Sequence, residues 1–261
     1  MIRVDLHMHT TRSDGRHSLQ EVMDRCSAGR LDVVAVTDHD VATEPAEWEV
    51  EGRKVRRIGA SEVTANWRGG EIHLLAYFPA GIPDAFARFC DDQCARRTLR
   101  YEAARHALGW SGLPNAADLA ARGVIAPTRH HLARAMVDGQ HVRDLRSAFA
   151  HLGRGLVPRF DRTAKEALSA IAEAGGISCW AHPPLNLARD GLAELVGWGL
   201  RAIELVRPAN TSRDRYALRK LASRHDLLFS GGSDWHGWHD APLGLFHATE
   251  ADVGPLLAEL A

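Results

Sequence analysis

The chain of 261 residues lacks any long apolar run, and it contains only four cysteines. No stretch approaches the roughly 20 apolar residues that span a bilayer, so we expect no membrane segment. The first residues, MIRVDLHMHT, lack the apolar region of a secretory signal, which argues against export. The cysteines form neither a CxxC metal motif nor a disulfide framework. These absences predict a protein of the reducing cytoplasm.

Lysine is absent from residues 81–160, where 12 arginines outnumber 7 acidic residues and leave a surplus of five positive charges. Because the whole chain has a net charge of −1, the remainder carries −6. A basic, arginine-only segment on an acidic body suits a metal site that receives an anionic substrate, although a solvated helical surface has the same composition. The near-neutral total and the lack of an aromatic series argue against a protein that coats nucleic acid.

Strand-like and helix-like segments alternate along most of the chain. Ser18 with Glu21, and Thr163 with Glu166, are spaced as capping boxes that begin helices. Several strand-like segments are apolar on both faces, as in a buried parallel sheet. With right-handed crossovers throughout, this order predicts a closed α/β barrel of the (β/α)7 type. The seven expected strands span residues 2–7, 31–40, 54–64, 71–78, 176–184, 200–206 and 226–236.

The alternation is interrupted after residue 80. Residues 84–108 form one long helical pattern, and shorter helical patterns follow to about residue 155. We therefore expect the chain to fold into two parts. Residues 1–80 and 156–261 form a barrel that carries the functional site, and residues 81–155 form a helical, arginine-rich insertion that covers it.

Histidines and acidic residues gather where the expected strands end. His7 and His9 lie two residues apart on a strand, so their side chains point to the same face. In α/β barrels this rim is where catalytic sites are built. Several carboxylates on one rim would repel each other unless cations lay between them, which predicts a metal site. The candidate residues are His7, His9, Asp14, Asp38, His39, Glu62, His73, His182, Asp234 and His236.

The segments that carry these residues resemble the signature motifs of a known family. DLHMHTTRSDG, VAVTDHD, GASEV, AHPP and GGSDWHG are similar, in this order and along the whole chain, to motifs of the PHP (polymerase and histidinol phosphatase) domain of metal-dependent phosphoesterases. The resemblance implies a distorted (β/α)7 barrel and the hydrolysis of phosphate esters. One departure is Ala60, where the family usually has glycine two residues before the glutamate.

The resemblance also implies two to three divalent metal ions. The expected sites are built from His7, His9, Glu62 and Asp234; from Asp14, His39 and His236; and from Glu62, His73 and His182. Ions held by Glu62 and Asp234 would share the attacking hydroxide. Asp14 stands where several relatives have histidine, and Asp38 would support the ligands rather than bind an ion. Imidazole and carboxylate together suit manganese, iron or zinc, with manganese expected first.

The insertion contains APTRHHLARAMVDG, which resembles an R-x-H-apolar-A-R stretch in one branch of the family. That branch dephosphorylates nucleoside 3′,5′-bisphosphates and trims RNA from its 5′ end. Arg129 and His131 match the stretch and are expected to bind phosphate and assist catalysis, with Arg134 also binding substrate. In the alternative interpretation, Thr128 begins a helix and the charges are solvated. Arg100, on the long helix outside the stretch, is expected to matter little.

The leading hypothesis is therefore a phosphatase that removes the 3′-phosphate of nucleoside 3′,5′-bisphosphates, such as adenosine 3′,5′-bisphosphate. The same site could also act as a 5′-3′ exonuclease on short oligoribonucleotides. Histidinol-phosphate phosphatase is the alternative enzyme, but a net-positive insertion disfavours a cationic substrate. A non-catalytic PHP module is the alternative of another class, and the filled ligand positions argue against it. The sequence indicates no stable protein partner.

Overall fold

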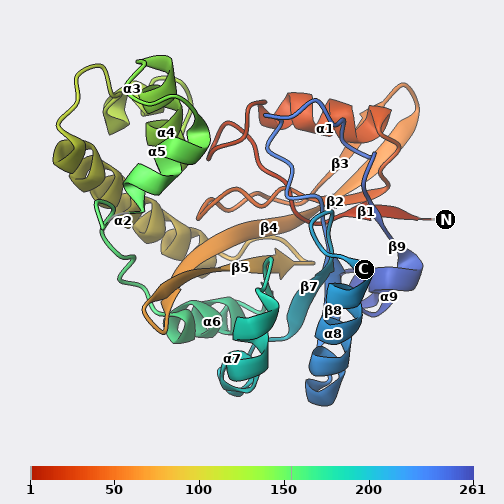
Figure 1. The fold of residues 1–261 in the computed structure, drawn as a ribbon. Helices are drawn as coiled ribbons and strands as arrows, with labels where there is room; N and C mark the ends of the chain where they lie inside the picture. The colour runs from red at the N-terminus through yellow and green to blue at the C-terminus, as the bar shows by residue number, and fades with distance from the viewer. Residues whose placement is uncertain (1, 154) are drawn as a thin grey trace.

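The computed structural model describes residues 2–153 and 155–261, and one sheet runs through its centre (Figure 1). Within these residues the sheet has nine strands, hydrogen-bonded in the order β8-β7-β6-β5-β4-β2-β1-β9, with β3 paired to β4. The strands are β1 (Arg3–Asp5), β2 (Val33–Ala35), β3 (Ala46–Val50), β4 (Arg53–Trp67), β5 (Gly70–Phe78), β6 (Ile177–Trp180), β7 (Ala202–Val206), β8 (Leu228–Gly231) and β9 (Ala248–Thr249). Each of the seven expected segments contains one strand, and the sequence indicated neither β3 nor β9.

The two ends of this sheet come together along the segments that follow β1 and β8. The sheet is therefore a distorted, nearly closed barrel. The Leu6 N–H donates to the Gly231 carbonyl at 3.0 Å, and the Asp234 N–H donates to the His7 carbonyl at 2.8 Å. The buried Tyr77 hydroxyl donates to the Leu6 carbonyl at 3.0 Å and so ties β5 to the same seam. The closure of the barrel therefore joins the segments that carry His7 and Asp234.

The connection from β4 to β5 differs from the expected crossovers. These strands form an antiparallel hairpin, in which Trp67 pairs with Gly70. The two turn residues, Arg68 and Gly69, have φ of 51° and 77°, the left-handed values that a type I′ hairpin turn requires. β5 then pairs with β6, also antiparallel. The prediction of crossovers throughout is wrong here, because a parallel connection needs about a dozen residues or more and this turn has two.

Helices pack on the outside of the barrel, with α1 on one side of the barrel and α6 to α9 on the opposite side (Figure 1). They are α1 (Leu19–Ala28), α6 (Ala164–Glu173), α7 (Leu185–Gly197), α8 (Ser212–Ala222) and α9 (Glu250–Glu259). Both predicted capping boxes are confirmed, at the start of α1 and of α6. The Ser18 N–H, for example, donates to the Glu21 carboxylate at 2.8 Å. Each box satisfies main-chain N–H groups that the first helical turn leaves unpaired.

Residues 84–152 form a group of four helices: α2 (Asp84–Leu108), α3 (Ala116–Ala120), α4 (Arg129–Asp138) and α5 (Leu145–Leu152). The α2 helix spans the whole predicted range and joins two apolar cores. Phe86 and Cys90 in its first half pack in the barrel core, whereas Tyr101 and Ala104 belong to a second cluster with residues of α4 and α5. Figure 1 shows α3, α4 and α5 gathered at the far end of α2.

None of the helices in the described residues combines the length and the apolar character of a membrane span. The four cysteines are free thiols. On α2, Cys90 is buried in the core, while the Cys94 thiol points to the carbonyl oxygen of Asp40 at 3.2 Å.

Candidate metal centre

The structure brings the histidines and carboxylates of the strand ends into one cluster. His7 and His9 follow β1, and Asp234 follows β8. Glu62 and His73 are diagonal neighbours across the β4–β5 hairpin, because Glu62 pairs with Leu75 two residues further along. The hairpin that breaks the crossover pattern thus presents both side chains to the cluster. Glu62 lies within β4, which continues to Trp67, rather than at the strand end where it was expected, and His73 lies within β5. The members of the cluster are His7, His9, Asp14, His39, Glu62, His73, His182, Asp234 and His236.

Glu62 lies at the centre of the cluster, and it is only 1% exposed. Its carboxylate oxygens lie 2.9–3.4 Å from ring nitrogens of five histidines: His7, His9, His39, His73 and His182. Burial opposes ionisation, but the neighbouring histidines outweigh it and hold the pKa of Glu62 well below its usual range. Glu62 is therefore a charged carboxylate that can serve more than one cation.

Several buried atoms of the cluster have no hydrogen-bond partner within the described residues, among them Nε2 of His7, Nε2 of His9 and Oε2 of Glu62. Such unpaired groups are costly unless something else binds them. Two ligand atoms that each lie about 2.1 Å from one ion are about 3.0–3.4 Å apart at angles of 90–109°. His7 Nε2 lies 3.3 Å from Glu62 Oε1 and 3.4 Å from Asp234 Oδ1. These residues fit a divalent metal ion.

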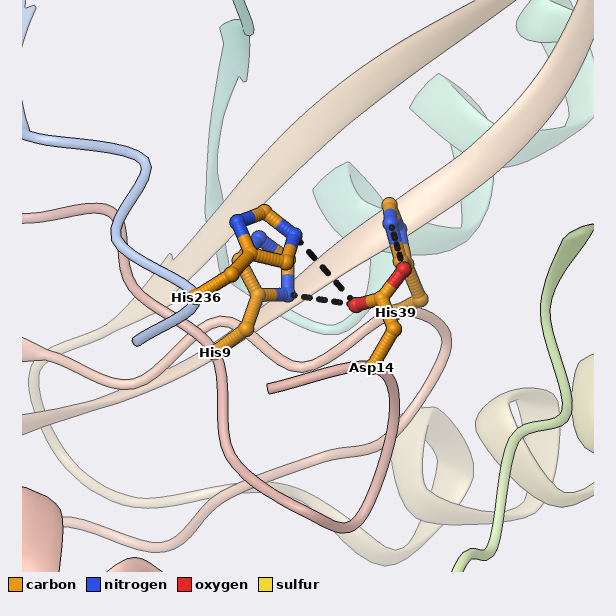
Figure 2. Close-up of side chains that lie close together, drawn as sticks. All are labelled: His9, Asp14, His39 and His236. Carbon is orange, nitrogen blue, oxygen red and sulfur yellow. Dashed lines mark ion pairs between the residues drawn. The ribbon is translucent and has the colours of Figure 1, made fainter. Parts of the chain in front are cut away.

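A second group surrounds Asp14, whose two oxygens face three histidines (Figure 2). Oδ1 lies 3.3 Å from His236 Nε2 and 3.7 Å from His9 Nδ1, and Oδ2 lies 3.6 Å from His39 Nε2. Burial alone would lower the pKa of His236, but the carboxylates of Asp14 and Asp234 raise it to about 9. A metal ion bound here would replace that proton.

A third group consists of His73, His182 and Glu62. His73 Nδ1, His182 Nε2 and Glu62 Oε1 form a triangle with sides of 3.1–3.2 Å, which is a suitable spacing for three ligands of one ion. His39 lies between the second and third groups. Its Nδ1 is 2.9 Å from Glu62 and its Nε2 is 3.6 Å from Asp14, so it could join either group.

Asp38 lies behind the cluster rather than in it. The carboxylate is fully buried and accepts hydrogen bonds from the Thr10 N–H at 2.8 Å and from the hydroxyls of Thr10 and Ser13 at 2.6 Å. These contacts fix the loop between His9 and Asp14. Asp38 therefore holds the loop that carries His9 and Asp14, and its role in support of the ligands stays a prediction.

Glu204 also belongs to the site, although it is not among the residues predicted from the sequence. It is buried on β7, where Oε1 lies 2.9 Å from His7 Nδ1 and Oε2 accepts from the His182 N–H at 2.7 Å. When Nδ1 of His7 donates to this carboxylate, Nε2 turns its lone pair towards the cluster. The signal was a lone carboxylate within the apolar run AIELV.

Replacing Glu204 with glutamine is expected to weaken metal binding by about 10- to 100-fold. The N–H groups of His7 and His182 both need acceptors here, and glutamine offers one oxygen where glutamate offers two. Titration of metal-free protein against a competing chelator measures the affinity. Glu173→Gln, on the exposed end of α6, is the matched control. Equal affinities for the two variants would show that Glu204 does not orient a ligand.

A cavity of about 680 Å³ opens beside the cluster, and its lining includes the carboxylate of Glu71 and three larger groups of residues. The first group belongs to the cluster: Asp14, His39, His73, Asp234 and His236. The second is arginine from the insertion: Arg97, Arg100, Arg129 and Arg134. The third is aromatic or apolar: His130, Phe149, Trp235, Trp238 and Leu245. Metal-binding, cationic and stacking groups therefore all face the same cavity.

Two of the predicted substrate-binding residues, Arg129 and Arg134, line this cavity from α4. Arg129 is half-exposed, and its Nη2 lies 3.0 Å from Glu71 Oε1. The guanidinium carbon of Arg134 lies 4.4 Å from the centre of the Trp238 ring. Trp238 in turn donates from Nε1 to the Asp14 carbonyl at 2.7 Å, so α4 contacts the loop that carries Asp14.

The third predicted residue, His131, caps the helix. Thr128 begins α4, and the Thr128 N–H donates to His131 Nδ1 at 3.0 Å. The neighbouring His130, rather than His131, lines the cavity. The capping interpretation of this stretch therefore holds for Thr128 and His131, while Arg129 and Arg134 line the cavity.

Arg100 lies in a different environment from the one expected. Its side chain is only 12% exposed and lines the cavity, with Nη2 2.5 Å from Glu71 Oε2. Arg100 therefore lies at the cavity, and the expectation that replacing it changes little stays a prediction. The helical pattern of α2 could not show this position, because the partner lies 29 positions away, on β5.

A buried ion pair joins α2 to the loop that carries His39. Arg97 donates from Nε at 2.9 Å and from Nη2 at 2.6 Å to Asp40 Oδ2. Asp40 has φ of 56° and also accepts from the Thr64 N–H at 2.8 Å. The pair holds the insertion in place against the rim of the barrel. Neither residue belongs to the set predicted from the sequence.

Known proteins resemble the chain along most of its length, although no protein-family model matches it. It is 32% identical to a 5′-3′ exoribonuclease of Haemophilus influenzae, over 90% of this chain and 92% of that protein. It is 30% identical to a 3′,5′-nucleoside bisphosphate phosphatase of Chromobacterium violaceum, over 90% of this chain and 88% of that protein. A solved structure from Bifidobacterium adolescentis, described as a metal-dependent phosphoesterase, matches with a TM-score of 0.77 and 23% identity, over 98% of this chain and 94% of that one.

The fold and the cluster agree with these similarities. The likeness to the solved structure supports the barrel, and the two curated relatives cover nearly the whole chain. The cluster supplies the imidazole and carboxylate ligands that a metal-dependent enzyme requires. The chain therefore belongs to the PHP family of metal-dependent phosphoesterases, in the group that includes 5′-3′ exoribonucleases and 3′,5′-nucleoside bisphosphate phosphatases.

Proposed function

We propose that this protein is a metal-dependent hydrolase that removes the 3′-phosphate of nucleoside 3′,5′-bisphosphates. One observation carries the proposal: the cluster of histidines and carboxylates and the arginines of the insertion line the same cavity. Carboxylates alone would repel a phosphate dianion, and arginines alone would bind it without activating water. Together they suit the binding and hydrolysis of a substrate rich in phosphate.

We assign two to three divalent ions to the cluster, with manganese first and iron or zinc as alternatives. The proposed sites are His7, His9, Glu62 and Asp234; Asp14, His39 and His236; and Glu62, His73 and His182. Bound ions supply Lewis-acid charge and lower the pKa of water at the site. The ligand-to-ligand distances and the unpaired buried atoms support this assignment.

The insertion's own side chains bind and orient the substrate. Arg129 can hold two phosphate oxygens with its planar guanidinium, and Arg134 adds a second positive charge from the same helix. His131 accepts at Nδ1 from the Thr128 N–H and so fixes the first turn of α4, the helix from which Arg129 and Arg134 line the cavity. We treat residues 81–155 as an insertion that covers a barrel made of 1–80 and 156–261. The second apolar cluster supports that division.

The aromatic part of the cavity suits a nucleobase. Trp238, His130 and Phe149 lie close together, with ring centres 5.2 Å apart for the first pair and 6.3 Å for His130 and Phe149. Bases stack on such rings with little dependence on their identity. The same arrangement would accept short oligoribonucleotides, so 5′-3′ exonuclease activity is part of the proposal. We also retain the cytoplasm as the expected location, supported by four free cysteines.

Comparing two substrates tests the proposed function. Adenosine 3′,5′-bisphosphate is expected to give a kcat/KM at least about 10²-fold higher than histidinol phosphate, because the arginines attract phosphate groups and repel a cationic amine. Phosphate release is measured for both substrates under the same metal conditions, and the nucleotide product identifies the phosphate removed. A higher kcat/KM for histidinol phosphate would contradict this proposal and would identify the protein as a histidinol-phosphate phosphatase.

A further inference from the structure

Glu71 connects the arginines of the insertion to the metal-binding cluster. Its Oε1 lies 3.0 Å from Arg129 Nη2 and 3.4 Å from His73 Nε2, and its Oε2 lies 2.5 Å from Arg100 Nη2. One carboxylate, mostly buried on β5, therefore contacts α2, α4 and a proposed ligand at the same time.

The two arginines depend on Glu71 to different degrees. Arg100 is also held by the Pro158 carbonyl, to which its Nε donates at 2.6 Å, and it is largely buried. Arg129 is 46% exposed, and Glu71 is its one acidic partner in the described part of the chain. Without this carboxylate the two cations would repel each other, and the more exposed Arg129 is the one free to move away from the cavity.

We propose that Glu71 is a positioning residue that holds Arg129 at a fixed place relative to His73, where its guanidinium meets the substrate's phosphate. The inference rests on the proposed function and adds a determinant of substrate binding to it. The charges of Arg100, Arg129 and Glu71 sum to +1, so the group keeps a net positive charge for the substrate while the arginines stay together. An arginine held in place loses less conformational entropy when the substrate binds.

A double-mutant cycle between Glu71 and Arg129 tests this role. The ligand is an adenosine 3′,5′-bisphosphate analogue with CH₂ in place of the bridging oxygen of the 3′-phosphate, which binds without being hydrolysed. Calorimetry on metal-loaded protein measures its Kd. Glu71→Gln is expected to raise the Kd about tenfold, a typical coupling for charged residues in contact. Arg129→Ala should raise it further, and the double variant should match Arg129→Ala, because Glu71 acts through Arg129.

A merely structural role for Glu71 would give a different pattern. In that case the effects of the two substitutions would multiply, and this result would overturn the proposal. Tighter binding by Glu71→Gln would also overturn it, since Glu71 would then compete with the substrate for Arg129. The matched control is Glu194→Gln, which removes an equivalent carboxylate from exposed Arg68, 2.7 Å away, and should leave the Kd unchanged. At saturating metal concentration, equal metal content is expected in all variants, and loss of metal from Glu71→Gln alone under these conditions would contradict the proposal.

Binding and hydrolysis are measured separately in this design. If wild-type protein binds the analogue but releases no phosphate from the bisphosphate itself, the proposed function is wrong and the cycle still decides the role of Glu71. If wild-type protein does not bind the analogue at all, both proposals are wrong.

Discussion

Glu62→Gln is expected to abolish metal binding at the centre of the cluster and to lower kcat/KM for adenosine 3′,5′-bisphosphate on the order of 10³-fold. Five imidazoles surround this one carboxylate within 3.4 Å, and the proposed sites on either side share it. Losing the carboxylate that the proposed ions share would remove their stabilisation of charge in the transition state, and a loss of about 4 kcal/mol in activation free energy corresponds to roughly 10³-fold in rate. Elemental analysis and kinetics on the same preparation measure both effects.

A surface glutamate provides the control for this change. Glu259→Gln removes a carboxylate that pairs with exposed Arg201 at 2.7 Å, and neither residue lines the cavity, so the change should leave metal content and kcat/KM unchanged. Circular dichroism checks that the Glu62→Gln protein is folded. A folded variant that retained its metal and its activity would remove Glu62 from the centre of the proposed site.

Arg129→Ala should lower kcat/KM by about 10²–10³-fold, or 2–4 kcal/mol, while metal content and fold are retained. Its guanidinium lines the cavity from the first turn of α4 and can hold two phosphate oxygens as charge develops in the transition state. The measurement is kcat/KM for adenosine 3′,5′-bisphosphate, with metal analysis of the same protein.

The insertion offers a better control than Arg100, which shares Glu71 with Arg129. Arg143 is 86% exposed and pairs with Asp144 at the surface, so Arg143→Ala should have nearly wild-type activity. If Arg129→Ala were equally active, or if it lost activity only by losing metal, the insertion would not bind the phosphate as proposed.

The cluster could be predicted from the sequence because strand ends meet on one rim whatever the details of the connections. His7 and Asp234 follow the short strands β1 and β8, and His7 lies 3.3 Å from Glu62 and 3.4 Å from Asp234. The long helix 84–108 was equally predictable, since 25 residues without proline or glycine favour one continuous helix.

Contacts between distant segments could not be predicted in the same way. Glu71 lies in an ordinary strand pattern, and only folding brings it against Arg100 and Arg129, which are 29 and 58 positions away. The hairpin was missed for another reason. Its Arg68-Gly69 turn is a short, local signal, and the alternation of strands and helices elsewhere favoured crossovers.

Metal-dependent phosphate release from adenosine 3′,5′-bisphosphate tests the central claim most directly. Protein stripped of metal by a chelator should release no phosphate. Adding Mn²⁺ should restore activity, which should saturate at two to three bound ions per chain and leave adenosine 5′-phosphate as the product. Undiminished hydrolysis by the metal-free protein, or saturation with manganese that leaves the bisphosphate intact, would contradict the account.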